Sequence, residues 1–154
     1  MEAGRPMNEV TRKLLLTIGG AFLLFGVSFI AHKVIGAGGP DTKISHHASL
    51  AGARQAGAVE RGWVPELLPA GSSDITEIHD LDKNTGTGTF RFPSADLEAF
   101  KAQARQFAGT DLKEASAVTY VAYSRDRSRF ELVLTPDPQR PDVMIGVWGM
   151  KPIR

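Results

Sequence analysis

An uninterrupted apolar run from Leu14 to Ala31 is the feature that most constrains what this chain can form. The run carries no charged residue, and at about 1.5 Å of rise per residue it spans about 27 Å as a helix. That length is close to the roughly 30 Å hydrocarbon core of a bilayer. Snorkelling of Lys33 extends the span to residue 35. The sequence therefore predicts a single-pass protein with a cytoplasmic tail over residues 1–13 and a transmembrane helix over residues 14–35.

The charges on either side of this segment favour an N-terminus inside the cell. Arg5, Arg12 and Lys13 precede the span, whereas only Lys33 and Lys43 follow it closely. The remainder of the chain is therefore predicted to be extracytoplasmic and tethered to the membrane. The apolar run is longer than the roughly 7–15 residues of a signal-peptide core, which favours a retained anchor. A secreted protein released by signal cleavage is the alternative.

Charge and cysteine content exclude several classes of function. Lys and Arg number 18 against 17 Asp and Glu, so the formal net charge of +1 gives no strong attraction to nucleic acid. The absence of cysteine excludes disulfides, thiol catalysis and zinc sites built on cysteine. We therefore expect no nucleic-acid partner and no thiol chemistry.

Residues 36–59 are rich in Gly, Ala and Ser, and we predict that they form a flexible linker. The folded domain is then expected over residues 60–154. It opens with a proline-flanked arm, Gly62–Pro69, whose two prolines exclude a regular helix or a central strand. Trp63 on this arm is expected to pack onto the domain together with its apolar neighbours.

Alternation and turn residues predict a small α+β domain. Ile75 and Leu81 are expected on one face of the first strand, and an apolar stripe at helical spacing (Leu97, Phe100, Ala104, Phe107) predicts a packed helix. The order is β-β-α-β-β-β with a mostly antiparallel sheet. The strands are expected over residues 74–81, 87–92, 118–123, 129–135 and 143–150, and the helix over residues 94–107.

The acidic stretch Asp80–Gly86 resembles a calcium loop in composition only. An EF-hand needs glycine at its sixth position and glutamate at its twelfth, where this chain has Thr85 and Arg91. His79 stands beside Asp80 and Asp82 without a further set of ligands, and we expect it to be a half-exposed strand residue. We therefore predict no metal, no cofactor and no catalytic residue; a small metal-dependent binder or enzyme that uses His79, Asp80 and Asp82 is the alternative.

Candidate interaction residues lie on a predicted turn and at two tryptophans. Arg125, Arg127 and Arg129 are spaced by two around the turn and suit an acidic partner or lipid headgroups. Trp148 marks a binding face if it points outward from the last strand, and Trp63 does so if the arm is not packed.

One stretch resembles a segment of small bacterial envelope proteins of uncharacterised function, which are membrane-anchored or secreted. The residues that carry the resemblance are Gly62-Trp63-Val64-Pro65, Leu68-Pro69, Ile75-Thr76-Glu77 and His79-Asp80-Leu81-Asp82. It covers about thirty residues and implies an extracytoplasmic domain with paired early strands, but no activity. Together with this resemblance, the sequence predicts an interaction or accessory protein of the bacterial envelope that is not an enzyme and has a protein partner. It is expected to be tethered to the inner membrane with its domain in the periplasm.

Overall fold

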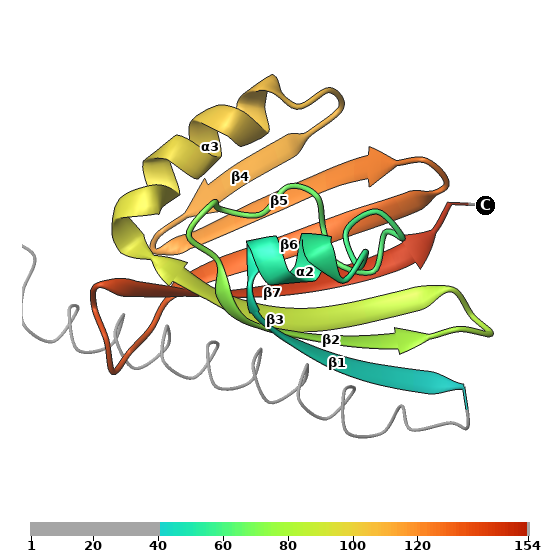
Figure 1. Ribbon diagram of the computed structural model, residues 1–154. Helices are drawn as coiled ribbons and strands as arrows, with labels where there is room; N and C mark the ends of the chain where they lie inside the picture. Colours follow the sequence, from blue (N-terminus) through green and yellow to red (C-terminus); the bar gives the residue numbers. More distant parts are fainter. Residues whose placement is uncertain (1–40, 154) are drawn as a thin grey trace, which may run out of the picture. The chain divides into compact units, whose positions relative to one another are not determined.

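The computed structural model describes residues 41–153 (Figure 1). These residues belong to a compact unit that spans Gly39–Arg154. Within the described residues no helix is both long and apolar enough to cross a membrane. The predicted tail and transmembrane helix, residues 1–35, lie outside the described part of the chain.

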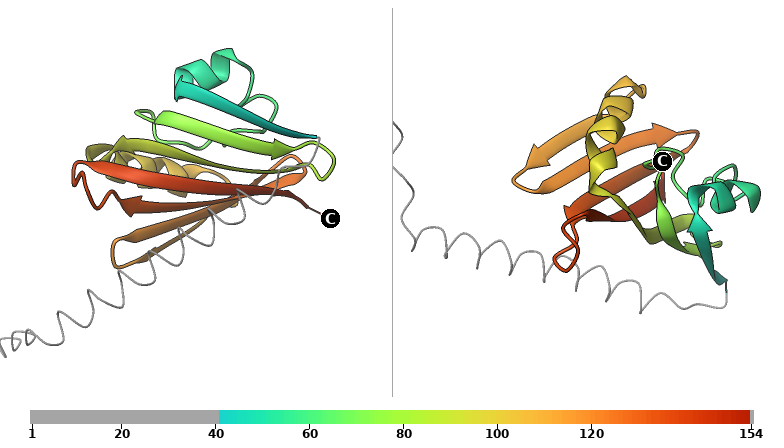
Figure 2. Two further views of the ribbon diagram at one scale, coloured as in Figure 1. Left: turned by 90° about the horizontal axis from the view of Figure 1, so that it is seen from below. Right: turned by 60° about the vertical axis from the view of Figure 1, so that its left-hand side comes forward.

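A seven-stranded sheet in the order β1-β2-β3-β7-β6-β5-β4 forms the body of the domain. Each pair of neighbouring strands is antiparallel, which confirms the predicted sheet type. Figure 2 shows that the sheet is strongly twisted. The strands are β1 Thr42–Ser49, β2 Ser73–Asp80, β3 Thr85–Pro93, β4 Asp111–Ala115, β5 Val118–Arg125, β6 Ser128–Pro136 and β7 Val143–Pro152.

Two helices and a long loop pack against the sheet. Helix α2 (Leu50–Gln55) follows β1, and helix α3 (Leu97–Gln106) follows a single 3-10 turn, η1 (Ser94–Asp96). Residues 56–72, here called the cover loop, connect α2 to β2. Buried apolar side chains of both helices and of the cover loop join one core with the strand residues that face them: Leu50, Ala53, Val64, Leu67, Leu68, Phe100 and Ala104. The sheet is thus covered on one face, here called the inner face.

Large and small residues alternate across the middle of the inner face. Gly88 on β3 is opposite Trp148 on β7, and Gly146 on β7 is opposite Phe90 on β3. A Cβ atom added at Gly88 would lie 2.2 Å from the Trp148 ring, and one added at Gly146 would lie 2.1 Å from the Phe90 ring. Each aromatic ring therefore occupies the space that the facing glycine leaves free.

The later elements agree with their predictions. Strands β3, β5, β6 and β7 and helix α3 occur where alternation or helical spacing predicted them. Phe100 and Ala104 are buried, and Leu97 and Phe107 pack against the core, so the predicted apolar stripe of α3 is confirmed. The cover loop also packs as expected, because Leu67 and Leu68 are buried.

The flexible linker predicted over residues 36–59 is wrong from residue 42 onward, because β1 and α2 lie there. β1 is an edge strand that pairs only with β2, and its polar side chains show no alternation. Its order comes from backbone pairing with a strand far along the sequence. Ser49 starts α2 by accepting a hydrogen bond from the Gly52 amide at 3.1 Å, and Gly57 with φ of 73° follows its end.

Two further details correct the sequence analysis. The other edge strand, β4, was not predicted, because its residues are polar and only Leu112 packs against the core. On β2, Ile75 is buried as expected, but Leu81 lies beyond the strand and is 42% exposed. The side chains that share the inner face with Ile75 are instead Glu77 and His79, both buried.

Candidate functional site

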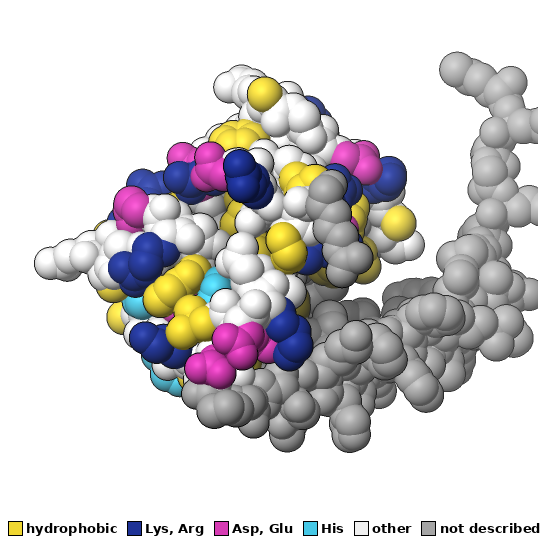
Figure 3. Space-filling model, turned by 90° about the vertical axis from the view of Figure 1, so that its right-hand side faces the viewer, with side chains coloured by type: hydrophobic (Ala, Val, Ile, Leu, Met, Phe, Trp, Pro, Cys, Tyr) yellow, Lys and Arg dark blue, Asp and Glu magenta, His cyan; other side chains and the backbone are white. Residues whose placement is uncertain are grey.

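A pocket with a volume of about 350 Å³ opens at one end of the sheet. Its walls come from three separate segments: the cover loop, the turn between β2 and β3, and the turn between β5 and β6. Figure 3 views the molecule from this end and shows basic, acidic and apolar side chains close together. The lining residues are Glu60, Arg61, Gly62, Asn84, Arg125, Asp126, Arg127, Ser128, Phe130 and Met150.

The three arginines predicted as an interaction cluster have three different environments. Arg125 is held by Glu66 at 3.2 Å and by the Val59 carbonyl oxygen at 3.3 Å, so it fastens the cover loop to β5. Arg127 is exposed at the tip of the β5–β6 turn and lines the pocket. Arg129 lies outside the pocket lining, where it pairs with Glu131 at 3.1 Å. The pocket thus contains two of the three predicted arginines.

The third arginine of the pocket, Arg61, comes from the cover loop and was not singled out in the sequence. Its Nη2 donates to the Ala56 carbonyl oxygen at 2.9 Å, and its guanidinium carbon lies 4.3 Å from the centroid of the Trp63 ring. Trp63 in turn lies on the His79 ring, with 5.0 Å between centroids. This Arg61–Trp63–His79 stack leads from the pocket rim to the buried face of β2. Trp63 is half-buried, so it is packed and still reaches the surface.

The second predicted tryptophan has no such access. Trp148 is 1% exposed and packs over Gly88, so its interpretation as part of a binding face is wrong. The strand alternation could not decide this point, because it left open which set of β7 side chains faces inward.

Ionisable side chains are buried beneath the cover loop. Glu77 is 1% exposed and neither of its carboxylate oxygens has a hydrogen-bond partner among the described residues. Burial raises the pKa of Glu77, while the Ser45 hydroxyl and the charges of His47 and Arg61 act against that rise. A buried carboxyl group without a hydrogen-bond partner costs folding stability, so Glu77 needs an explanation other than the packing of the core.

His79 is also buried, at 2% exposure, which corrects its interpretation as a half-exposed strand residue. Burial lowers the pKa of His79, with a smaller opposing effect from Asp80. The neutral ring is therefore favoured, and a neutral ring fits the contact with Trp63. Gly86 lies opposite on β3 and leaves room for the His79 ring, whose Nδ1 would be 3.2 Å from a Cβ atom at residue 86.

The three residues of the predicted metal-binding alternative do not converge. Asp80 is on the opposite side of β2 from His79, where it pairs with Lys83 at 2.6 Å. These contacts with Lys83 lower the pKa of Asp80. Asp82 is exposed in the turn that follows. Among residues 41–153 no three His, Cys, Asp or Glu side chains are grouped to hold a metal ion.

Comparison with known proteins gives one match. The family model described as the YbbD head domain matches residues 41–91, which is about a third of the chain. The match begins at the start of the described fold and covers β1, α2, the cover loop, β2 and most of β3. No curated protein and no solved structure matches the chain. The matched region includes Arg61, Trp63, Glu77 and His79 but ends before the β5–β6 turn.

Proposed function

We propose that the chain is a single-pass protein of the bacterial inner membrane that holds a non-catalytic binding head on the periplasmic side. The observation that carries this proposal is where the fold begins. Residues 36–40 alone separate the predicted span from Asp41, which leads directly into β1. A stretch of this length reaches at most about 18 Å when fully extended. The proposed head is therefore joined to the proposed anchor by a short connection.

The chemistry of the head supports binding more than catalysis. The pocket is lined by guanidinium groups, exposed carboxylates and apolar floor residues, and His79 does not line it. General acid–base chemistry needs a titrating group within hydrogen-bond reach of a bound substrate. The buried pair Glu77 and His79 is instead covered by the loop that carries Trp63. A site that recognises an anionic group and positions the head is the function that this arrangement supports best.

The anchor is tested by carbonate extraction of the full-length chain from native membranes. The span is held by burial of apolar side chains, so the protein is expected to stay in the pellet. A variant with Leu23→Arg and Phe25→Arg places two charges in the span and is expected to move to the supernatant. Recovery of the unaltered chain in the supernatant would contradict the anchor, and an intact mass lacking the apolar run would show signal cleavage.

The orientation is tested with single cysteines, because the natural chain has none. Gln103→Cys lies exposed on α3, and Asn8→Cys lies in the predicted cytoplasmic tail. A membrane-impermeant maleimide is expected to label the first variant in intact spheroplasts and the second only after lysis. The reverse pattern would place the head in the cytoplasm.

A further inference from the structure

The strand ends at the pocket form one end of the sheet, here called the proximal end. Backbone pairing places Thr42 opposite Asp80, Asp80 opposite Thr85, and Ser128 opposite both Arg125 and Pro152. The first residue of β1 is therefore at the same end as the pocket (Figure 1). Along the sequence, the first residue of β1 is closer to the predicted span than any other strand residue, so the proposed anchor is joined to the head at its proximal end. This step rests on the proposed function.

Exposed apolar side chains gather at the same end. Among the described residues the exposed large hydrophobic side chains are Ile44 at 61%, Leu81 at 42% and Ile153 at 48%. Leu81 directly follows β2, Ile153 directly follows β7, and Ile44 is the third residue of β1. Figure 3 faces this end and shows hydrophobic side chains among charged ones. Apolar side chains beside cations are the combination that binds at a membrane interface.

Arg61 and Arg127 are the pocket cations that remain available to a ligand. Both are exposed and line the pocket, and neither forms a direct salt bridge in the part of the chain that the structure describes, although the charge of Arg61 also acts on the buried Glu77; Arg125, in contrast, is engaged by Glu66. The Arg127 carbonyl oxygen accepts a hydrogen bond from the Ile153 amide at 2.7 Å, which fixes the backbone of the turn. Two guanidinium groups from separate segments can grip one phosphate from two sides.

The acidic side chains of the pocket restrict what can bind. Glu60 and Asp126 line the same pocket, so its rim is not broadly positive. A diffuse attraction to any anionic surface is therefore weak, and a compact anion that reaches both guanidinium groups is preferred. We propose that the proximal-end pocket binds the phosphate of an anionic lipid headgroup through Arg61 and Arg127, with the exposed apolar side chains of that end in the membrane interface.

The test uses the full-length chain in lipid nanodiscs, one set of phosphatidylcholine alone and one containing phosphatidylglycerol. Trp63 reports on the pocket because its ring lies under Arg61, whereas Trp148 is buried and supplies a constant background. The anionic discs are expected to shift the Trp63 emission relative to the phosphatidylcholine discs. Arg127→Gln is expected to abolish this difference, since it removes one guanidinium without touching Trp63. Arg129→Gln is the matched control from the same hairpin and is expected to retain it.

A second arm separates lipid phosphate from soluble phosphate. Inorganic phosphate is titrated against the chain in both kinds of disc. Binding is expected in phosphatidylcholine discs, at least about tenfold weaker in Arg127→Gln, and absent in anionic discs whose lipid already fills the pocket. Equal binding of phosphate in both discs, or no emission difference between them, would overturn the lipid assignment. Loss of the anchor in the carbonate test with phosphate binding retained would overturn the proposed function while leaving an anion pocket.

Discussion

Strands β2 and β6 both bury side chains on the inner face, but those of β2 include ionisable groups and those of β6 are all apolar. Each turns three alternate side chains toward the covered face: Ile75, Glu77 and His79 on β2, and Phe130, Leu132 and Leu134 on β6. Leu132 and Glu77 belong to one row, because Leu132 is opposite Trp148, Trp148 is opposite Gly88, and Gly88 is opposite Glu77. The burial is equal, yet only β6 is apolar.

The difference shows that the two strands are shaped by different demands. β6 packs against β5, whose Tyr123 stacks on Phe130 with centroids 5.2 Å apart, and it contributes only packing. Burial raises the pKa of Tyr123 to about 12, so its hydroxyl stays neutral where it accepts a hydrogen bond from the Leu67 amide at 3.3 Å. β2 lies one strand from the edge and carries ionisable groups that cost stability.

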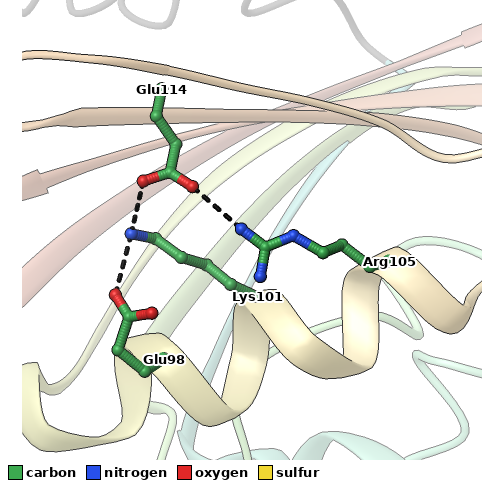
Figure 4. Close-up of polar contacts among 4 residues, drawn as sticks. All are labelled: Glu98, Lys101, Arg105 and Glu114. Atoms are coloured by element: carbon green, nitrogen blue, oxygen red, sulfur yellow. Dashed lines mark hydrogen bonds and ion pairs between the residues drawn. The ribbon is translucent and has the colours of Figure 1, made fainter.

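On the β4 side, Lys101 is 7% exposed, and its charge is paired with carboxylates that reach the solvent (Figure 4). Lys101 on α3 donates to Glu98 at 2.9 Å and to Glu114 on β4 at 2.7 Å, and Arg105 donates to Glu114 at 3.1 Å. The hydrogen bonds to Glu114 and Glu98 raise the pKa of Lys101, and the hydrogen bond from Lys101 lowers the pKa of Glu114. Every charge has a partner here, in contrast to Glu77. The helix thus holds the polar edge strand β4 through paired charges.

Of the substitutions that test this comparison, the largest loss of stability is expected in the apolar strand β6. Leu132→Ala leaves a cavity in a fully buried row and is expected to lower the free energy of unfolding by about 2–5 kcal/mol. Urea unfolding of the full-length chain in a non-ionic detergent, followed by tryptophan fluorescence, measures it. Val133→Ala changes the neighbouring, half-buried residue on the other face and is expected to cost clearly less. Equal losses would mean that burial does not distinguish the two faces.

A smaller loss is expected for the ring that covers the polar strand. Trp63→Ala removes a half-buried ring from His79 and from Arg61, and we expect a loss of about 2 kcal/mol. Trp148 remains as the fluorescent reporter in the same urea experiment. Trp63→Phe keeps an aromatic ring over His79 and should recover much of the loss. A change within about 0.5 kcal/mol for Trp63→Ala would assign the ring to a partner interface and not to the core.

The smallest expected effect has the opposite sign and depends on pH. Burial holds the pKa of folded Glu77 above its ordinary value, so its favourable contribution is present at acidic pH and is lost as pH rises through the folded pKa. Glu77→Gln should therefore match the natural chain near pH 4 and exceed its stability at pH 8 by on the order of 1 kcal/mol. Thermal unfolding at both pH values measures the difference.

The exposed Glu60→Gln is the control for Glu77→Gln and should show no such dependence on pH. His79 titrates in the opposite sense, because its pKa is lowered by burial and its contribution is lost as pH falls below about 6.5. It is present in both the natural chain and the Glu77 variant, so its effect cancels in the comparison. A pH-independent difference between Glu77→Gln and the natural chain would mean that the pKa of Glu77 is the same in the folded and unfolded states.

Much of the fold could be predicted from local sequence patterns. The elements that were not predicted share one physical reason. β5, β6, β7 and α3 have apolar side chains at the period of their structure, so sequence alone placed them. β1 and β4 lie at the two edges of the sheet, where few side chains are buried and no period appears. Their pairing with β2 and β5 is a tertiary event that overrides local propensity.

Only those residues of the candidate site that lie close together in the sequence were predicted. Arg125 and Arg127 stand two residues apart and were identified, but Arg61 reaches the same pocket from a loop more than sixty positions earlier in the chain. The segment that contains His79 and Asp80 drew attention to a metal site, because sequence adjacency hides the fact that neighbouring strand residues face opposite ways. The burial of Glu77 had no signal, since a polar residue between apolar ones is also typical of an exposed strand position.

The glycine and tryptophan that face each other across β3 and β7 have a consequence for how this domain can diverge. A side chain at residue 88 would occupy the space that the indole ring of Trp148 fills. A Cβ atom at residue 88 would also lie 2.3 Å from the Thr76 carbonyl oxygen on β2, whereas Gly149 faces open space and is free to vary. Descendants of a common ancestor should therefore keep glycine at residue 88 even where a smaller ring replaces Trp148, because the backbone of β2 alone excludes a Cβ atom there.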